Sequence, residues 1–208
     1  MTARRTLRPA GIVAEAVALP GRVLLGITGP PGAGKSTVAE DVRRQAEAAG
    51  RTAVVVPMDG FHLAQQVLDA RGLAEVKGAP HTFDAHGFVA VLRRIREQRD
   101  ETVWAPAFDR DLEQPVAGAI GVDPDTDIVV VEGNYLLLQQ DPWVTVREIL
   151  DRTWYVEVPD DVRRARLVQR HRRFGDDLER ATRRALGNDE RNARLVAATR
   201  HLADLVLD

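Results

Sequence analysis

Residues 29–37 read Gly29-Pro30-Pro31-Gly32-Ala33-Gly34-Lys35-Ser36-Thr37 and form the most specific motif in the chain. They match the phosphate-binding pattern G-x-x-x-x-G-K-[S/T] at every fixed position. The apolar run from Val23 to Ile27 precedes them and predicts a buried strand. Downstream, apolar residues recur at helical spacing until Gly50, which is placed to end a helix. Strand, Gly-rich turn and helix start are the context in which this motif holds a phosphate chain.

The chemistry of the motif predicts a site for a nucleoside triphosphate. Backbone N–H groups of the turn can surround the β-phosphate, and the helix N-terminus adds about half a positive charge. Lys35 would reach the β- and γ-phosphates, and the Ser36 hydroxyl would hold Mg²⁺. The expected nucleotide contacts are Gly29, Pro31, Gly32, Ala33, Gly34, Lys35, Ser36 and Thr37. A chance Gly-rich turn is the alternative, but Lys35 and Lys77 are the only two lysines in the sequence, so a lysine here is not background composition.

Length and composition favour one globular α/β domain spanning residues 1–208. The chain has 208 residues, of which 44% are hydrophobic and 29% charged, with a formal net charge of −2. This charge argues against a general binder of nucleic acid or of a membrane surface, and no run approaches the roughly 20 apolar residues of a membrane span. The absence of cysteine excludes disulfides and thiolate chemistry and fits a cytoplasmic protein.

The N-terminal segment imitates a secretion signal. Arg4, Arg5 and Arg8 precede a mostly apolar stretch that ends at Leu19. Glu15 interrupts that stretch, so an amphipathic helix lying on the domain is the preferred interpretation.

Short apolar runs alternate with helical patterns along the rest of the chain. Strands are expected at 53–56, 103–106, 128–131, 154–158 and 205–207, and helices within 62–71, 84–95, 141–150 and 160–175, with two more before the last strand. The segment 107–127 predicts a loop with a minor strand pair. The alternation predicts a three-layer α/β/α fold with a mainly parallel sheet and an active site at the carboxyl ends of its strands.

Two carboxylates follow strands at that edge. Asp59 comes just past the second strand, where it could accept the proton of a substrate hydroxyl that attacks the γ-phosphate. An ordinary turn aspartate before Gly60 is the alternative. Glu132 ends the strand at 128–131, where a carboxylate near Mg²⁺ is expected, and a solvent-exposed strand end is the alternative.

Arginines dominate the region of about 160–186, which we expect to be a lid. Arg163, Arg166, Arg170 and Arg173 share one helical face, which could close over the phosphates and stabilise the transferring group. A solvated basic face is the alternative. Arg166 and Arg170 are the first candidates for phosphate contact, and the cluster is too local to indicate nucleic-acid binding.

Three segments together resemble the P-loop small-molecule kinases, the group of uridine kinase, phosphoribulokinase and bacterial pantothenate kinase. They are Gly29 to Thr37, Asp59-Gly60-Phe61 and Val131-Glu132-Gly133-Asn134-Tyr135. The resemblance runs from about residue 23 to the C-terminus. It implies a P-loop NTPase fold that uses ATP and Mg²⁺, with Asp59 as the base and Glu132 beside the metal.

Segments near the expected acceptor site separate this chain from the named families. Lys77 to Asp84 is most similar to pantothenate kinase, but Phe108 and Arg110 stand where that family has a tyrosine and a histidine. Glu113 and Pro115 stand where uridine kinases have a His-x-Arg segment. Overall the chain is most similar to a subgroup labelled as fructose-transport-system kinases.

The sequence therefore predicts an ATP-dependent kinase that phosphorylates a hydroxyl of a small metabolite. A sugar such as fructose is one candidate acceptor, and a pantothenate kinase-like or nucleoside kinase activity is the alternative. The acceptor site is expected to contain Asp59, His62, Lys77, Asp84, Phe108, Asp109 and Arg110. The catalytic residues are expected to be Lys35, Asp59, Arg166 and Arg170.

Two rivals belong to other functional classes. A regulatory GTPase or ATPase switch would need a guanine-reading motif such as Asn-Lys-x-Asp, and Asn188-Asp189 lacks that lysine. A degenerate fold kept as a binding module is disfavoured because the phosphate-binding and acidic residues are intact. The oligomeric state stays open, with a homodimer as one alternative.

Overall fold

The computed structural model describes residues 19–208. The amphipathic helix predicted before Leu19 lies outside the described residues. The strands are β1 (Val23–Thr28), β2 (Ala53–Pro57), β3 (Val103–Asp109), β4 (Gln114–Val122), β5 (Ile128–Glu132), β6 (Arg152–Val156) and β7 (Leu205–Leu207). The α-helices are α2 (Lys35–Ala48), α3 (Gln65–Ala70), α4 (Ala85–Glu97), α5 (Val144–Ile149), α6 (Asp160–Arg173), α7 (Leu178–Leu186) and α8 (Asn188–Ala197).

Five strands form one parallel sheet in the order β2-β5-β1-β6-β7. Their apolar runs are continuous because a strand covered on both faces buries every side chain. On β5, Val129 and Val131 pack into a core with residues of α4 and α5, whereas Ile128 and Val130 pack into a second core with residues of α2. The predicted mainly parallel α/β architecture is thus confirmed.

Helix α2 ends at the glycine that the sequence predicts as its C-terminal signal. Gly50 has φ +78°, its N–H donates to Glu47 O at 2.9 Å, and the Arg51 N–H donates to Ala46 O at 3.0 Å. These two bonds make a Schellman motif, which satisfies carbonyl groups that the helix itself leaves unpaired.

The segment after α4 differs from its prediction. Instead of a loop with a minor strand pair, β3 and the nine-residue β4 form a two-stranded antiparallel sheet in which Val103 pairs with Val122. The register shifts between Ala105 and Ala107, opposite Gly118 with φ +65°. The glycines and prolines of this segment indicate turns, but they accommodate an irregularity within a long ribbon.

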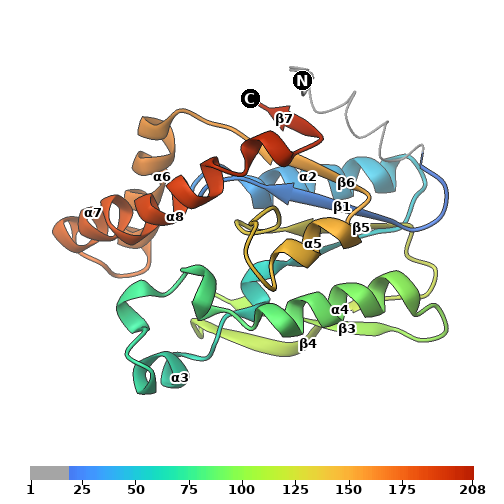
Figure 1. Ribbon diagram of the computed structural model, residues 1–208, viewed down its shortest axis with the longest axis horizontal. Helices are drawn as coiled ribbons and strands as arrows, with labels where there is room; N and C mark the ends of the chain where they lie inside the picture. The colour runs from blue at the N-terminus through green and yellow to red at the C-terminus, as the bar shows by residue number, and fades with distance from the viewer. Residues whose placement is uncertain (1–18) are drawn as a thin grey trace.

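The carboxyl ends of the parallel strands lie at one edge of the sheet, where helices and the candidate site residues come together. Figure 1 shows α6, α7 and α8 in orange and red beyond the carboxyl ends of β1 and β6, with α3 in green below them. The Gly-rich loop follows β1 at this edge, Asp59 follows β2, and Glu132 ends β5. None of the helices within residues 19–208 is long and apolar enough to cross a membrane.

Candidate active site

The Gly-rich loop between β1 and α2 depends on glycine for its shape. Gly29, Gly32 and Gly34 have φ of 150°, 81° and 96°. A Cβ on Gly29 would lie 2.5 Å from Val156 O, and one on Gly32 would lie 2.7 Å from Arg163 O. Gly34 precedes α2 without a side-chain cap, so the first N–H groups of that helix remain available to an anion.

Lys35 and Ser36 begin α2 and face the carboxylate that ends β5. The Lys35 ammonium is buried and donates to Pro30 O at 3.2 Å. Burial lowers the pKa of Lys35, although the Glu132 and Asp59 carboxylates oppose this effect. The Ser36 hydroxyl donates to Glu132 Oε1 at 3.2 Å. Burial, and then the Asp59 charge, raise the pKa of Glu132.

The loop opens onto a polar cavity of about 150 Å³ at the carboxyl edge of the sheet. Most of the residues predicted for the site line this cavity. They are Pro31, Gly32, Lys35, Ser36, Asp59, His62, Lys77, Phe108, Arg110, Glu132 and Arg170. The structure therefore brings two expected sets of residues to one space. We call Lys35, Ser36 and Glu132 its donor wall, and Asp59, His62, Lys77, Phe108 and Arg110 its acceptor wall.

Asp59 lies in a 3₁₀ turn, Met58–Phe61, directly after β2. Its Oδ2 accepts a hydrogen bond from Arg110 at 2.7 Å, and its Oδ1 lies 4.0 Å from His62 Nε2. Burial alone would raise the pKa of Asp59, but the surrounding positive charges outweigh burial and lower it. His62 contributes only when protonated, whereas Arg110, Arg170 and Lys35 contribute at neutral pH. Asp59 is therefore ionised and able to accept a proton.

His62 is held between two aromatic rings on the acceptor wall. Its ring stacks on Phe83 with centroids 3.9 Å apart and meets the edge of Phe108 at 5.4 Å. Burial lowers the pKa of His62 to about 4, even though Asp59 opposes the shift. The imidazole is thus neutral near pH 7 and can exchange hydrogen bonds with an uncharged group.

Two cationic side chains, from different segments of the chain, make cation–π contacts with the Phe108 ring. The Lys77 ammonium lies 5.2 Å from the ring centroid, and the Arg110 guanidinium carbon lies 4.8 Å from it. Lys77 also donates to Gln65 Oε1 and to Glu113 O, both at 3.2 Å. Through Glu113, the tip of the β3–β4 ribbon therefore contacts the loop after α3.

Two predicted acceptor residues do not line the cavity. Asp84 caps α4 and accepts the Gly87 N–H at 2.8 Å. Asp109 Oδ1 accepts the N–H groups of Asp111 and Leu112 at 2.8 and 2.9 Å. Both carboxylates satisfy local backbone groups, so the expectation that they contact the acceptor is corrected.

The arginines of α6 divide into two kinds. Arg170 lines the cavity, and Arg166 Nη1 lies 3.4 Å from the carbonyl oxygen of Gly32, beside the loop. Arg163, predicted on the same face, is buried and pairs with Glu190 of α8 and with Asp160. It holds the helix in place and does not reach the cavity.

Sequence reasoning missed the contribution of α8. Asn188 Nδ2 donates to Lys77 O at 2.9 Å, and Asn192 Nδ2 donates to Gly78 O at 3.2 Å. Between them Asp189 Oδ2 accepts a hydrogen bond from His171 Nε2 of α6 at 2.7 Å. The i, i+4 spacing of the two asparagines on one helical face was the available signal. One turn of α8 thus connects the arginine helix to the acceptor loop.

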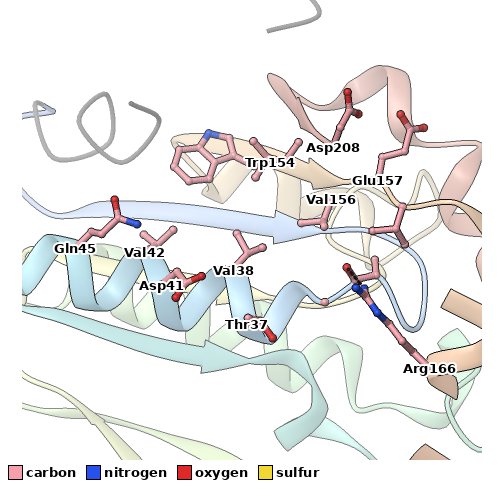
Figure 2. Close-up of a pocket in the computed structure, with 14 residues that line it drawn as sticks. Thr37, Val38, Asp41, Val42, Gln45, Trp154, Val156, Glu157, Arg166 and Asp208 are labelled. Atoms are coloured by element: carbon pink, nitrogen blue, oxygen red, sulfur yellow. Dashed lines mark hydrogen bonds between the residues drawn. The ribbon is translucent and has the colours of Figure 1, made fainter. Parts of the chain in front are cut away.

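A second cavity, of about 510 Å³, extends from the Gly-rich loop along α2. Figure 2 shows Thr37 and Val38 of α2 on one side of it and Trp154 and Val156 of β6 on the other. Arg166 lies at the end nearest the loop. The cavity exists because α2 leaves part of its own apolar face and part of the sheet uncovered. Sequence reasoning also missed this largely apolar space, because the spacing of residues does not show how α2 packs on the sheet.

Comparison with known proteins agrees with this geometry. The chain matches the Phosphoribulokinase / Uridine kinase family over residues 24–208. It belongs to this family. A Schizosaccharomyces pombe protein named "Putative uridine kinase C227.14" is 37% identical over 194 residues, which cover 89% of this chain and 83% of that protein.

Solved structures support membership of the family. A "putative fructose transport system kinase" from Silicibacter sp. TM1040 is 40% identical, with a TM-score of 0.88 over 96% of this chain and 98% of that chain. A "putative P-loop containing kinase" of Saccharomyces cerevisiae shares the fold at 17% identity, with a TM-score of 0.82 over 97% of this chain and 99% of that chain. The chain is thus a kinase with the P-loop α/β fold of this family.

Proposed function

We propose that the protein transfers the γ-phosphate of ATP to a hydroxyl of a small metabolite. The observation that carries the proposal is the shared cavity of Lys35, Ser36, Asp59 and Glu132, which combines a phosphate-binding loop with a candidate base. A protein that only bound nucleotide would not need an ionised carboxylate facing the site of the γ-phosphate.

The donor half of the site suits a triphosphate with a divalent cation. The Gly-rich loop and the start of α2 offer backbone N–H groups, and Lys35 offers a buried positive charge. Ser36 Oγ and Glu132 Oε1, 3.2 Å apart, are hard oxygen ligands that fit Mg²⁺. Residues 19–208 contain no cluster of three or more His, Cys, Asp or Glu for a metal, which suits an ion held mainly by phosphates and water. When bound, Mg²⁺ would neutralise charge on the phosphates.

The transfer step follows from the position of Asp59. Its carboxylate takes the proton of the acceptor hydroxyl while the hydroxyl oxygen bonds to the γ-phosphorus. The bond between this phosphorus and the bridging oxygen breaks, and ADP leaves with that electron pair. Lys35 and Arg170 stabilise the charge that develops on the transferring group.

The nucleoside part of ATP would occupy the second cavity. That cavity begins at Gly34 and Thr37, so a phosphate chain in the loop leads directly into it. Trp154 and Val158 offer apolar surface to a base, and Asp41 and Glu157 offer hydrogen-bond acceptors.

The acceptor remains to be identified among several classes. A sugar such as fructose is supported by the name of the Silicibacter relative. A nucleoside is supported by the name of the Schizosaccharomyces pombe relative. Phe108 and Arg110 depart from the pantothenate kinase pattern, which makes pantothenate the weakest of the three.

ADP release, measured over a panel of sugars, sugar acids, nucleosides and pantothenate, tests the proposal. We expect turnover that depends on both Mg²⁺ and one class of acceptor. ATP binding without acceptor-dependent ADP release would contradict a phosphotransferase.

A further inference from the structure

We infer that the acceptor carries a carboxylate or phosphate close to the hydroxyl that is phosphorylated, and that Arg110 binds this anionic group. The inference rests on the proposed function and narrows its substrate class. It follows from how two cations and one carboxylate share the acceptor wall.

The contact between Arg110 and Asp59 places a guanidinium beside the reacting hydroxyl. Arg110 Nη2 lies 2.7 Å from Asp59 Oδ2, and no hydrogen bond is recorded on Asp59 Oδ1 among the described residues. A hydroxyl that gives its proton to this carboxylate must therefore lie next to the guanidinium. One N–H of Arg110 is engaged by Asp59, and the fork of a guanidinium has five.

The Arg110 side chain has the freedom to turn toward a ligand. It is 40% exposed, whereas the Asp59 side chain is 30% exposed. Its guanidinium carbon lies 4.8 Å from the Phe108 ring centroid, a contact that uses no N–H. A carboxylate or phosphate on the acceptor can take two parallel hydrogen bonds from such a fork.

Lys77 provides a second cation on the same wall. Its ammonium contacts two neutral oxygens, of Gln65 and of the Glu113 backbone, which leaves one of its three N–H groups. The nearest carboxylate, of Glu113, is 3.6 Å away, and its side chain is 51% exposed. Water screens a carboxylate at that exposure, so it neutralises Lys77 weakly.

The remaining acidic groups of the cavity have other partners. Glu132 faces Ser36 on the donor wall, and Asp189 contacts His171. His62 is neutral near pH 7 because burial lowers its pKa to about 4. Asp59 must share its carboxylate between Arg110 and the hydroxyl, and the exposed Glu113 carboxylate offsets the charge of Lys77 only weakly. An anionic group on the acceptor would pair with both cations, whereas a neutral polyol would add no charge to either.

Matched acceptor pairs test the inference by ADP release. Each pair has one carbon skeleton with and without the anionic group: glycerate and glycerol, gluconate and glucose, fructose 6-phosphate and fructose. We expect kcat/KM to be at least about 100-fold higher for the anionic member of the preferred pair. The acid pairs and the phosphate pair distinguish a carboxylate from a phosphate as the recognised group.

Variants of Arg110 identify the residue that recognises the anion. Arg110→Gln should reduce the preference within the pair at least 10-fold and leave the dissociation constant of ATP unchanged, and Arg110→Lys should restore part of it. The control is Arg94→Gln on the exposed surface of α4, where the Arg94 side chain donates to Gln98 Oε1 at 3.3 Å. This variant should behave as the wild type.

Different results overturn the inference and the proposed function. Equal use of neutral and anionic acceptors, or equal loss on both in Arg110→Gln, overturns the inference and leaves the kinase proposal intact. ADP release that no acceptor of any class stimulates overturns the proposed function, and the inference with it.

Discussion

Replacing Glu190 by glutamine should loosen the arginine helix, because Glu190 joins α8 to α6. Its carboxylate bonds to Arg163, whose side chain is 2% exposed, and accepts a second bond from Arg164 at 2.8 Å. Glutamine keeps the size of the side chain but removes the charge. Among the described residues, Asp160, whose side chain is 64% exposed, then remains as the carboxylate partner of Arg163.

The size of the loss follows from the pKa of Glu190 and from the cost of breaking a buried ion pair. The hydrogen bond from Arg164, and then that from Arg163, lower the pKa of Glu190 from 4.5 to about 2 although burial opposes them. At about 1.4 kcal/mol for each pH unit, this difference of about 2.5 units corresponds to roughly 3.5 kcal/mol. Breaking a buried ion pair by removing one partner costs about 3–5 kcal/mol. Because Asp160 remains, we expect a loss of about 3 kcal/mol in the free energy of unfolding.

Urea denaturation at pH 7 measures this loss as a shift of the midpoint at an unchanged slope. Glu179→Gln is the matched control, because Glu179 is 82% exposed and pairs with Arg183 on the surface of α7. It should change stability by less than about 0.5 kcal/mol. A loss below about 1 kcal/mol in Glu190→Gln would refute the account of the buried pair.

The same pair predicts a pH dependence. The folded-state pKa of Glu190 is lowered, so its contribution to stability is complete above about pH 4.5 and is lost as the pH falls toward about 2. In Glu190→Gln that part of the acid destabilisation should be absent. Equal acid sensitivity of both proteins would contradict the assignment.

Three further predictions concern the nucleotide and acceptor sites. Gly32→Ala should weaken ATP binding about 30-fold by calorimetry, because its φ is +81° and the new Cβ would lie 2.7 Å from Arg163 O; unchanged affinity would contradict the loop geometry. Asn192→Ala should raise the acceptor KM about 10-fold and leave the ATP dissociation constant unchanged, because it removes a bond to Gly78 O; an equal change in both constants would indicate general unfolding. In a protein with Trp104 and Trp143 replaced by phenylalanine, the fluorescence emission maximum of Trp154 should shift when ATP binds, because Trp154 lines the cavity proposed for the nucleoside. An unchanged spectrum would place the adenine elsewhere.

The parts of the site that follow strands were predictable from the sequence. Asp59 and Glu132 each follow a continuous apolar run, and the carboxyl ends of parallel strands meet at one edge. Their convergence on Lys35 therefore needs only the strand assignment and the parallel topology.

The remaining parts depend on tertiary contacts that spacing does not encode. Asp84 and Asp109 have the residue type of a ligand, but nearby backbone N–H groups claim their carboxylates. Asn188 and Asn192 reach the acceptor loop only because α8 packs against residues more than a hundred positions earlier. Arg163 shares a helical face with Arg170, but it is buried where α6 meets the Gly-rich loop and Glu190 of α8.

The most direct test of the central claim is single-turnover phosphate transfer by Asp59→Asn, compared with its ATP affinity. Asparagine keeps the shape of the side chain but cannot take the proton of the hydroxyl. We expect ATP to bind with unchanged affinity and transfer to fall at least about 100-fold. Transfer at the wild-type rate would contradict the role of Asp59 as the base.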